Sequence, residues 1–335
     1  MATTISDIAK CANVSKATVS RVINNKSEGV GEETKQKILN IIKEMNYQPS
    51  LIARGLVTKR IQSIGLIIPD IANPFFPQLA RGAEDAALKR GYNLFLCNSD
   101  NSLEKEKNYI NAFIKKSVDG VILTSSMSRS NIQCQMLKDS NIPFTLLDRY
   151  IEGMEQEAGV FLDNEEGAYR ATSYLLKNGH VRIVFISGPF SVTTAWQRFQ
   201  GFQKAHFDRG VPIDYQLIRE GEYHLESGRK FVEQLLTDNI PFSAVFAGND
   251  MIAIGALKAL KKQHIKVPAS VEIIGFDNID LSALIEPALS TVAQPTYDMG
   301  ALGAEMLIDL IEGQELQQNN IYLKPELIFR ETTRQ

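Results

Sequence analysis

Cysteine and histidine are both scarce in this chain. Its 335 residues include three cysteines, Cys11, Cys97 and Cys134, and no two of them form a CxxC pair. The four histidines are scattered without the spacing of metal ligands. The sequence therefore predicts neither a disulfide framework nor a metal site, and it fits a reducing compartment.

Long apolar runs are missing as well. No stretch approaches the roughly 18 to 20 apolar residues that a membrane-spanning helix needs. Asp7 and Lys10 interrupt the apolar pattern near the amino terminus, which argues against a secretory signal peptide. We therefore expect a soluble, cytoplasmic protein with no membrane contact.

Catalytic motifs are a third absence. The chain contains no GxSxG, no GxxxxGKS/T and no dinucleotide-binding fingerprint. The adjacent Asp148 and Arg149 have no nucleophile and base beside them in the sequence. We expect a protein that is not an enzyme and uses no cofactor. A sugar-processing enzyme is the alternative class, and turnover of a sugar or sugar phosphate would reveal it.

Charge is unevenly divided along the chain. Residues 1–60 hold ten Lys or Arg against five Asp or Glu, a net charge of +5, whereas the other 275 residues hold 26 against 34, a net charge of −8. Attraction to a polyanion therefore belongs to the amino-terminal segment. The remainder is long enough to bury at least one large core of its own.

Two short amphipathic helices are predicted in that segment. Apolar residues recur at helical spacing over 5–12 and again from Val19 to Ile23, with Asn13 and Val14 in the turn between them. Ser15 stands where an N-cap hydroxyl would begin the second helix. The outer side of that helix would face the major groove of DNA, and it carries Lys16, Ala17, Thr18, Ser20 and Arg21.

A third helix is predicted over 32–45, and its apolar face can close a three-helix core. Pro49 then interrupts the pattern. Residues 50–56 form at most two helical turns, which are too short to be stable alone in water. We expect this segment to fold on a partner.

Beyond Arg60, short apolar strands alternate with amphipathic helices. The strands are predicted at 64–68, 94–96, 121–123, 144–147, 183–186, 244–247 and 271–274, and the helices at 78–90, 104–116, 167–178, 198–209, 227–236, 251–262 and 299–312. Strands that are apolar on both faces indicate parallel sheets covered by helices. About 270 residues of this pattern suggest two α/β subdomains with a ligand cleft between them.

Polar and aromatic residues gather where these strands end. They include Asp70, Asn73, Phe75 and Phe76 after the first run, and then Asp148, Arg149, Arg198, Asn249, Asp250, Asp277 and Gln294. Taken singly, an Asp or Asn after a strand is more often a helix N-cap, and paired phenylalanines are more often core. Together, carboxylates, amides, guanidinium groups and rings suit a neutral polyhydroxylated ligand.

Residues 4–56 resemble the DNA-binding headpiece and hinge of the LacI/GalR repressor family, and the remainder resembles its periplasmic-binding-protein-like core. Within the family, residues 69–85, 147–149 and 294–300 are similar to ribose-operon repressors. The resemblance implies a helix-turn-helix headpiece at 1–48, and a hinge helix and linker at 49–60. It also implies a core N-subdomain at 61–160 and 293–322, and a core C-subdomain at 161–292 and 323–335.

The predicted effector pocket is also similar to that of the periplasmic ribose-binding protein. Ser125 and Tyr223 depart from it, because they stand where that protein has an asparagine and a phenylalanine. The implied effector-binding residues are Asn73, Phe75, Phe76, Ser125, Asp148, Arg149, Arg198, Tyr223, Asn249, Asp277 and Gln294.

The resemblance also assigns roles in the headpiece. It places Lys16, Ala17 and Arg21 on base edges and Leu56 as a wedge in the minor groove, where an apolar side chain can bend the duplex. The loop at 24–30 looks about a residue longer than the usual form. The implied DNA-contacting residues are Thr4, Ser15, Lys16, Ala17, Thr18, Ser20, Arg21, Asn24, Ala53, Arg54 and Leu56.

We therefore interpret the chain as a homodimeric transcription regulator, a repressor that binds a palindromic operator and responds to a small sugar-like effector. Ribose is the leading candidate. A sugar acid, a sugar phosphate, a purine or a phosphorylated carrier protein acting as corepressor remain alternatives. Beyond Arg149 and Arg198 the sequence offers no basic cluster dedicated to phosphate, which favours a neutral or singly charged effector.

Overall fold

The computed structural model describes residues 3–23, 29–47, 60–126 and 130–334. These residues fall into two compact units, 1–61 and 62–335, which we describe separately. The segment expected to be the hinge, residues 49–60, lies almost entirely outside the described residues, and so does most of the loop at 24–30.

The first unit is the predicted three-helix bundle, built from α1 (Ile5–Ala12), α2 (Lys16–Ile23) and α3 (Glu32–Glu44). Its small core contains Ile8, Ala9, Ala12, Val19, Val22 and Ile38. Two polar residues, Asn13 and Ser15, stabilise the turn between α1 and α2. Asn13 ends α1 in the left-handed conformation with a φ of 56°, and the Ser15 hydroxyl accepts the Thr18 N–H at 3.1 Å. The N-cap predicted from the sequence is therefore confirmed.

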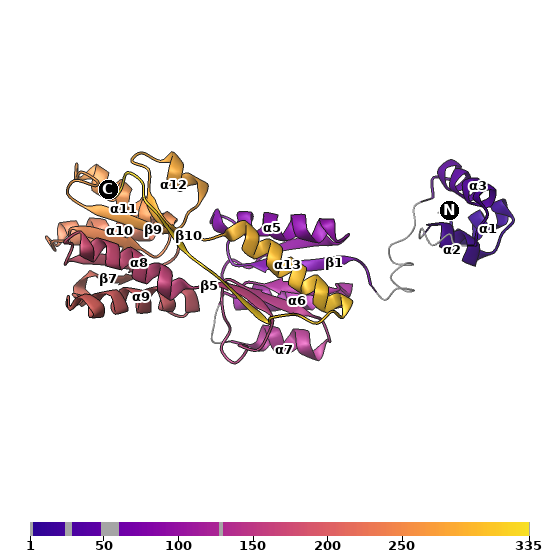
Figure 1. The fold of residues 1–335 in the computed structure, drawn as a ribbon, viewed down its shortest axis with the longest axis horizontal. Helices are drawn as coiled ribbons and strands as arrows, with labels where there is room; N and C mark the ends of the chain where they lie inside the picture. The colour runs from indigo at the N-terminus through magenta and orange to yellow at the C-terminus, as the bar shows by residue number, and fades with distance from the viewer. Residues whose placement is uncertain (1–2, 24–28, 48–59, 127–129, 335) are drawn as a thin grey trace. The chain divides into compact units, whose positions relative to one another are not determined.

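The second unit contains two subdomains. The first consists of a six-stranded parallel sheet and the helices that cover it (Figure 1). The strand order across the sheet is β11 (Asn320–Leu323), β5 (Gly159–Leu162), β4 (Phe144–Leu147), β3 (Gly120–Leu123), β1 (Ser63–Ile68) and β2 (Asn93–Asn98). Its helices are α5 (Phe75–Lys89), α6 (Leu103–Lys116), α7 (Ile132–Asp139) and α13 (Thr296–Glu312). A Cβ on Gly82 would lie 2.0 Å from the Tyr297 carbonyl oxygen, so glycine lets α5 and α13 pack closely.

The second subdomain contains the other six-stranded sheet. Its strand order is β12 (Glu326–Ile328), β10 (Ser290–Ala293), β9 (Glu272–Asp277), β8 (Ala244–Ala247), β6 (Ile183–Ser187) and β7 (Ile218–Glu220), and only β12 runs antiparallel to its neighbour. Its helices are α8 (Asn164–Lys177), α9 (Thr193–Arg209), the 3-10 turn η1 (Tyr215–Leu217), α10 (Leu225–Thr237), α11 (Asp250–Lys262) and α12 (Asp280–Leu284).

The chain passes between the two sheets three times, after β5, after β10 and after β11. These strands end at Leu162, Ala293 and Leu323, one or two residues beyond the divisions expected at 160, 292 and 322. The crossings place the carboxyl ends of both sets of parallel strands toward the junction of the subdomains, where Figure 1 shows the connecting segments.

Strand β2 differs from the expectation that every strand is apolar and buried on both faces. It is the edge strand of its sheet, and its residues Phe95 and Leu96 are exposed. Several elements were also missing from the sequence prediction, namely β5, β7, β10, β11, β12, α7 and α12. Most are edge strands or have four residues or fewer, and such lengths carry little periodicity.

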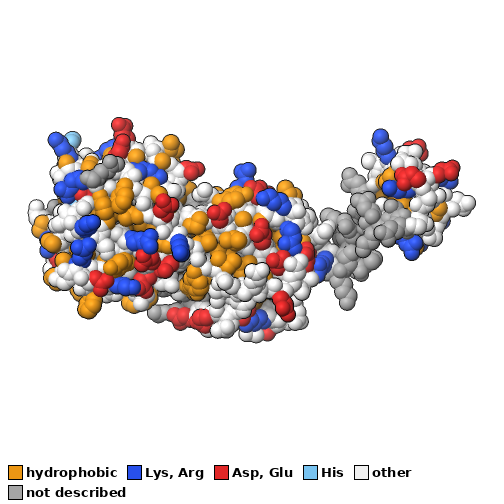
Figure 2. All heavy atoms as spheres, in the orientation of Figure 1, with side chains coloured by type: hydrophobic (Ala, Val, Ile, Leu, Met, Phe, Trp, Pro, Cys, Tyr) orange, Lys and Arg blue, Asp and Glu red, His pale blue; other side chains and the backbone are white. Residues whose placement is uncertain are grey.

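The outer surface of the second unit has a mixed character. On the face drawn in Figure 2, acidic, basic and apolar side chains are interspersed over this unit. Within the described residues, no helix is both long and apolar enough to cross a membrane.

Candidate functional site

The outer side of α2 carries the residues expected to contact DNA. Ser15, Lys16, Ala17 and Arg21 are exposed, and Thr18 and Ser20 are partly exposed, whereas Val19 and Val22 on the other side are buried. The helix has two cationic residues and no acidic one. This side therefore presents cations and small polar groups together, which is the chemistry that phosphates and base edges accept.

Thr4 is also exposed, but it caps α1. Its backbone N–H and its hydroxyl both donate to the Asp7 carboxylate, at 2.9 and 2.6 Å. These bonds lower the pKa of Asp7. The other four residues of the expected DNA-contacting set, Asn24, Ala53, Arg54 and Leu56, lie outside the described residues.

In the second unit, most of the predicted effector residues converge on one small cavity. The cavity has a volume of about 20 Å³, and we call it the cleft floor. Ten of the eleven predicted residues line it, together with Thr194, which the sequence analysis did not name. The lining residues are Asn73, Phe75, Phe76, Asp148, Arg149, Thr194, Arg198, Tyr223, Asn249, Asp277 and Gln294.

Two buried carboxylates stand at the floor in unusual backbone conformations. Asp148 follows β4 with a φ of 63°, and Asp277 ends β9 with a φ of 110°. Non-glycine residues adopt such angles at a cost, and they do so most often at functional sites. Each carboxylate lies near an arginine: Asp148 is 3.6 Å from Arg149 and Asp277 is 3.8 Å from Arg198.

Arg198 is held in place by the second subdomain. Its Nε donates to Asn164 Oδ1 at 2.9 Å, and its Nη1 donates to the Gly248 carbonyl oxygen. The guanidinium carbon lies 3.7 Å from the centre of the Phe276 ring. These contacts fix the direction of the buried cation before any ligand arrives.

Burial raises the pKa values of the two carboxyl groups at the cleft floor. It raises the pKa of Asp277 to about 7, although Arg198 and a 2.7 Å hydrogen bond from Gln294 Nε2 act in the opposite direction. Burial also raises the pKa of Asp148, against the attraction of Arg149 and Arg198. Near neutral pH, Asp277 can therefore both accept a hydrogen bond and, when protonated, donate one.

Three polar atoms of the floor lack hydrogen-bond partners among the described residues. They are Asp148 Oδ1, Arg149 Nε and Gln294 Oε1, and all three are buried. Buried polar atoms in folded proteins are nearly always paired, so exceptions call for an explanation. Here the exceptions come from three different residues that line the same cavity.

Two of the predicted effector residues, Asn249 and Ser125, make hydrogen bonds to other parts of the protein. Asn249 Oδ1 accepts the Ile252 N–H at 2.9 Å and caps α11, while its Nδ2 donates to the Tyr223 carbonyl oxygen at 3.3 Å. Ser125 lies outside the lining of the floor. Its hydroxyl donates to Glu106 at 3.5 Å, and its carbonyl oxygen accepts from Arg149 Nη1 at 3.1 Å. Asn249 therefore also serves as an N-cap, the ordinary role of such a residue.

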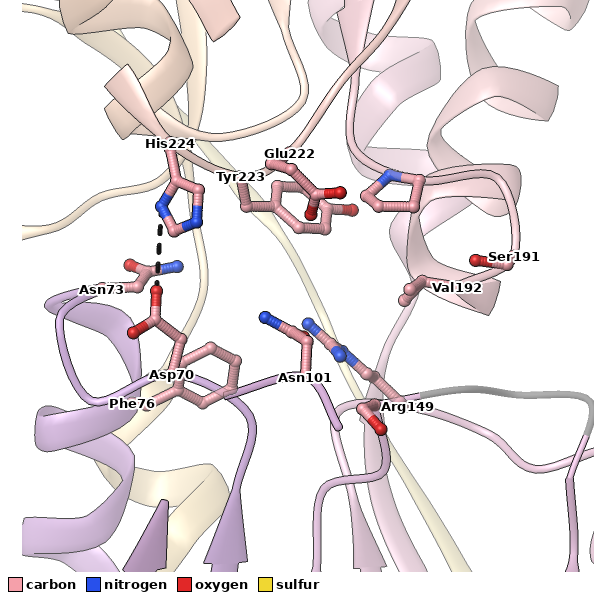
Figure 3. A pocket seen from close by; sticks show the side chains of 12 residues that line it. Asp70, Asn73, Phe76, Asn101, Arg149, Ser191, Val192, Glu222, Tyr223 and His224 are labelled. Atoms are coloured by element: carbon pink, nitrogen blue, oxygen red, sulfur yellow. Dashed lines mark ion pairs between the residues drawn. The ribbon is translucent and has the colours of Figure 1, made fainter. Parts of the chain in front are cut away.

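A wider cavity of about 210 Å³ opens outward from the floor, and we call it the outer chamber. The two cavities share Asn73, Phe76, Arg149 and Tyr223. Figure 3 shows the two sides facing one another. The first subdomain adds Asp70, Asn101 and Ser126, and the second adds Pro189, Ser191, Val192, Glu222 and His224.

Most residues of the outer chamber were not predicted from the sequence. Asp70 was noted in its run but was not among the effector candidates. Glu222 and His224 follow β7, a three-residue strand that the apolar pattern did not reveal. The signal used for the floor could have found Ser126 and Ser191, because they stand a few residues after β3 and β6, but it could not have found Glu222.

Two family models match the chain. The model described as "Bacterial regulatory proteins, lacI family" matches residues 4–50. The model described as "Periplasmic binding proteins and sugar binding domain of LacI family" matches residues 61–328. Together they cover the three-helix unit and nearly all of the two-subdomain unit.

Full-length relatives agree with these matches. The chain is 41% identical to a ribose operon repressor from Halalkalibacterium halodurans over 332 residues, which are 99% of this chain and 97% of the relative. It is 37% identical to catabolite control protein A from Priestia megaterium over 336 residues, which are 100% of both chains.

Solved structures show the same architecture. The lac repressor dimer bound to operator and the anti-inducer ONPF matches with a TM-score of 0.89 at 25% identity, covering 99% of each chain. A LacI family transcriptional regulator from Enterococcus faecium with bound ribose matches with a TM-score of 0.74 at 31% identity, covering 81% of this chain and 98% of that one.

The helical unit, the two parallel-sheet subdomains and the full-length matches support one assignment, and the relatives are regulators rather than enzymes. The chain belongs to the lacI family of bacterial regulatory proteins, and it joins a helix-turn-helix DNA-binding unit to a periplasmic-binding-protein-like core.

Proposed function

We propose that this regulator represses a carbohydrate-utilisation operon and is controlled by a neutral, sugar-like effector bound in the cleft against the residues of the cleft floor, with ribose as the leading candidate. The observation that carries this proposal is the set of buried atoms on Asp148, Arg149 and Gln294 that have no hydrogen-bond partner within the described part of the chain. A polyhydroxylated ligand offers donors and acceptors in pairs, so it can satisfy a carboxylate, a guanidinium and an amide at once.

The rings of the floor fit the same chemistry. Phe75 and Phe76 pack edge to face with ring centres 5.0 Å apart. Arg149 lies 5.7 Å from the centre of the Phe76 ring. Aromatic faces cover the C–H surface of a sugar, while carboxylates and guanidinium groups bind its hydroxyls. Asp148 and Asp277 lie within 4 Å of the two arginines and offset part of their charge, which weighs against a multiply charged ligand.

Ribose is favoured by the comparisons. A relative that is 41% identical is named a ribose operon repressor, and a structural neighbour holds ribose. Other relatives carry other names, including catabolite control protein A and the repressor PurR of Aliivibrio fischeri. The alternative effectors are therefore a sugar acid, a sugar phosphate, a purine and a phosphorylated carrier protein. A binding experiment must distinguish each of them from a neutral sugar.

On the DNA side we propose a homodimer that binds a palindromic operator. One three-helix unit contacts too few base pairs to specify a site, and a two-fold dimer matches a two-fold operator. One structural neighbour that matches over 99% of this chain is itself a dimer on operator DNA. The proposed contacts are the full set expected from the sequence, with Lys16, Ala17 and Arg21 on base edges.

Occupation of the floor would act on DNA binding by closing the cleft. Asp148 and Arg149 come from the first subdomain, and Arg198 and Asp277 come from the second. A ligand that bridges them favours a closed arrangement, and it can shift operator affinity only by the difference in its affinity for the two states.

The test is a set of thermal melts and operator titrations with and without ribose, hexoses, sugar acids, ribose 5-phosphate, nucleobases and a phosphorylated carrier protein. We expect a neutral sugar to raise the melting temperature and to change operator affinity. Asp277→Ala should abolish both responses while operator binding without ligand stays near the wild-type level. Asp139→Ala, at an exposed position on α7, is the matched control. If no neutral sugar acts on the wild-type protein, the neutral-effector proposal fails.

A further inference from the structure

The outer chamber differs from the floor in its charge. Asp70 and Glu222 face it from opposite subdomains, one after β1 and the other after β7 (Figure 3). The floor pairs two carboxylates with two arginines. The outer chamber therefore adds two carboxylates to a site in which each arginine already has a carboxylate within 4 Å.

Arg149 is the arginine that lines the outer chamber, but its charge is largely offset. Its Nε lies 3.6 Å from the Asp148 carboxylate, and its Nη1 donates to the Ser125 carbonyl oxygen at 3.1 Å. The other group that can carry positive charge is His224, whose Nδ1 is 3.8 Å from Asp70 across the cleft. The side chain of His224 is 54% exposed, so solvent screens it strongly.

The chamber also contains groups that suit an uncharged ligand. Ser126 is only 4% exposed, and its hydroxyl is buried without a hydrogen-bond partner among the described residues. Asn101 and Ser191 add an amide and a hydroxyl from opposite sides. An unpartnered buried hydroxyl in the wall of a cavity of about 210 Å³ points to a ligand group that reaches beyond the floor.

We propose that the outer chamber is a second subsite that selects the effector by charge, with Asp70 and Glu222 as its specificity-determining residues. It binds an uncharged, hydroxylated part of the effector and rejects a phosphate or carboxylate group. This proposal rests on the proposed function, because it assumes that the effector occupies the adjoining floor.

The physical basis is repulsion between like charges in a partly desolvated cavity. A phosphate ester attached to a sugar at the floor would project toward two carboxylates, and both desolvation and Coulomb repulsion would oppose its binding. Placing unfavourable charge against the wrong ligand is a common way to gain specificity. The Ala72 N–H donates to Asp70 Oδ1 at 2.9 Å and holds this carboxylate in place, and His224 weakens the repulsion only in its charged form.

The first experiment compares ribose with ribose 5-phosphate by calorimetry on the full-length protein. The cleft variant combines Asp70→Asn with Glu222→Gln. The control variant removes the same number of charges by combining Glu165→Gln with Asp139→Asn. Its two positions lie on α8 and α7 and are absent from the lining of both cavities. We expect the wild-type protein to prefer ribose. The cleft variant should gain affinity for the phosphate ester by about tenfold or more, as removal of unit charges at this range implies. The control should not.

A second experiment needs no knowledge of the effector. Inorganic phosphate is added during thermal melts, and it should stabilise the cleft variant but not the wild-type protein or the control. Glu222→Gln alone, which should show a smaller gain, replaces the double variant if the latter does not fold. Equal binding of ribose and ribose 5-phosphate by the wild-type protein would overturn the inference, as would a folded cleft variant that gains no phosphate binding.

These outcomes separate the two proposals. If no neutral sugar stabilises the wild-type protein, the proposed effector is wrong, and the phosphate melts still decide whether Asp70 and Glu222 exclude anions. If ribose binds and the cleft variant remains indifferent to phosphate, the proposed function survives and the charge-selective subsite does not.

Discussion

The two units of this protein carry their proposed recognition groups in opposite environments. Lys16 and Arg21 are exposed on α2, whereas Asp148, Arg198 and Asp277 are between 4% and 6% exposed. An exposed cation contributes little to stability and is free to meet a partner. A buried charge must be paired before the ligand arrives, so it serves the fold and the site together.

The units also differ in how much apolar surface supports them. Six buried residues make the headpiece core, whereas the second unit buries three clusters, the largest of which extends through both subdomains. Loss of one core side chain should therefore matter more to the headpiece. Loss of one buried charge should matter more to the second unit.

The largest effect is expected from Arg198→Ala. It leaves Asp277, Asn164 and the Gly248 carbonyl oxygen without their cation. Removing one partner of a buried pair costs about 3–5 kcal/mol of unfolding free energy. Urea unfolding followed by fluorescence of Trp196, the single tryptophan, reports on the same helix.

The control is Arg170→Ala, because Arg170 pairs with Glu166 on the surface of α8. It should cost under about 1 kcal/mol. Similar losses of unfolding free energy for the two variants would show that burial does not distinguish the two arginines.

Ile38→Ala should come next. Ile38 is fully buried between the headpiece helices, and truncation of such a side chain costs about 2–5 kcal/mol. We expect operator binding to be lost while the ligand response and the Trp196 unfolding transition are retained. Leu39→Ala, one position along α3 and 39% exposed, is the control and should have little effect. Loss of the ligand response in Ile38→Ala would show that the two units do not fold independently of each other.

Arg21→Ala tests the exposed recognition groups. As a base contact, Arg21 should contribute about 1–3 kcal/mol to operator binding and much less to random DNA, with thermal stability unchanged. Lys43→Ala, an exposed cation at the end of α3, is the control. Titrations on both DNAs distinguish the two roles, since equal losses for Arg21→Ala would show that it contacts phosphate only.

The smallest effect, taken per unit of pH, is a change in the pH dependence of stability at Asp277. Its pKa is raised from 3.8 to about 7 in the folded protein, so the folded state binds the proton more tightly than the unfolded state. The resulting stability is fully present below about pH 4 and is lost as pH rises through about 7. The slope between these values is at most about 1.4 kcal/mol per pH unit.

Asp277→Asn should remove this component. A slope of the same sign should remain, because burial also raises the pKa values of Asp148 and Asp250. Urea midpoints across this pH range give the measurement, with Asp139→Asn as the exposed control. An unchanged slope in Asp277→Asn would show that the carboxyl is ionised throughout.

Much of the headpiece could be predicted because its signals are local. The turn at Asn13, the N-cap at Ser15 and the apolar positions of α1 and α2 all act within a few residues of one another. The face of α2 then follows from helical periodicity alone. Stabilisation of this unit comes from the same residues that define the pattern.

The cleft was predicted in part, and for a different reason. In parallel sheets the carboxyl ends of strands share one edge, so strand-end residues such as Asp148 and Asp277 converge whatever lies between them. Ser125 shows the limit. The resemblance to the periplasmic ribose-binding protein placed it among the effector residues, but its hydroxyl donates to Glu106, and the next residue, Ser126, lines the outer chamber instead.

The two-unit organisation, the division of charge, the exposed face of α2 and most residues of the floor could be inferred from the sequence alone. Each depends on periodicity, composition or strand order, and these act over short distances along the chain. The tertiary structure decided the raised pKa of Asp277, the capping role of Asn249 and the meeting of Asp70 with His224. Those properties depend on burial and on contacts between residues up to about 150 positions apart, and no local pattern encodes the dielectric or the distance between two side chains.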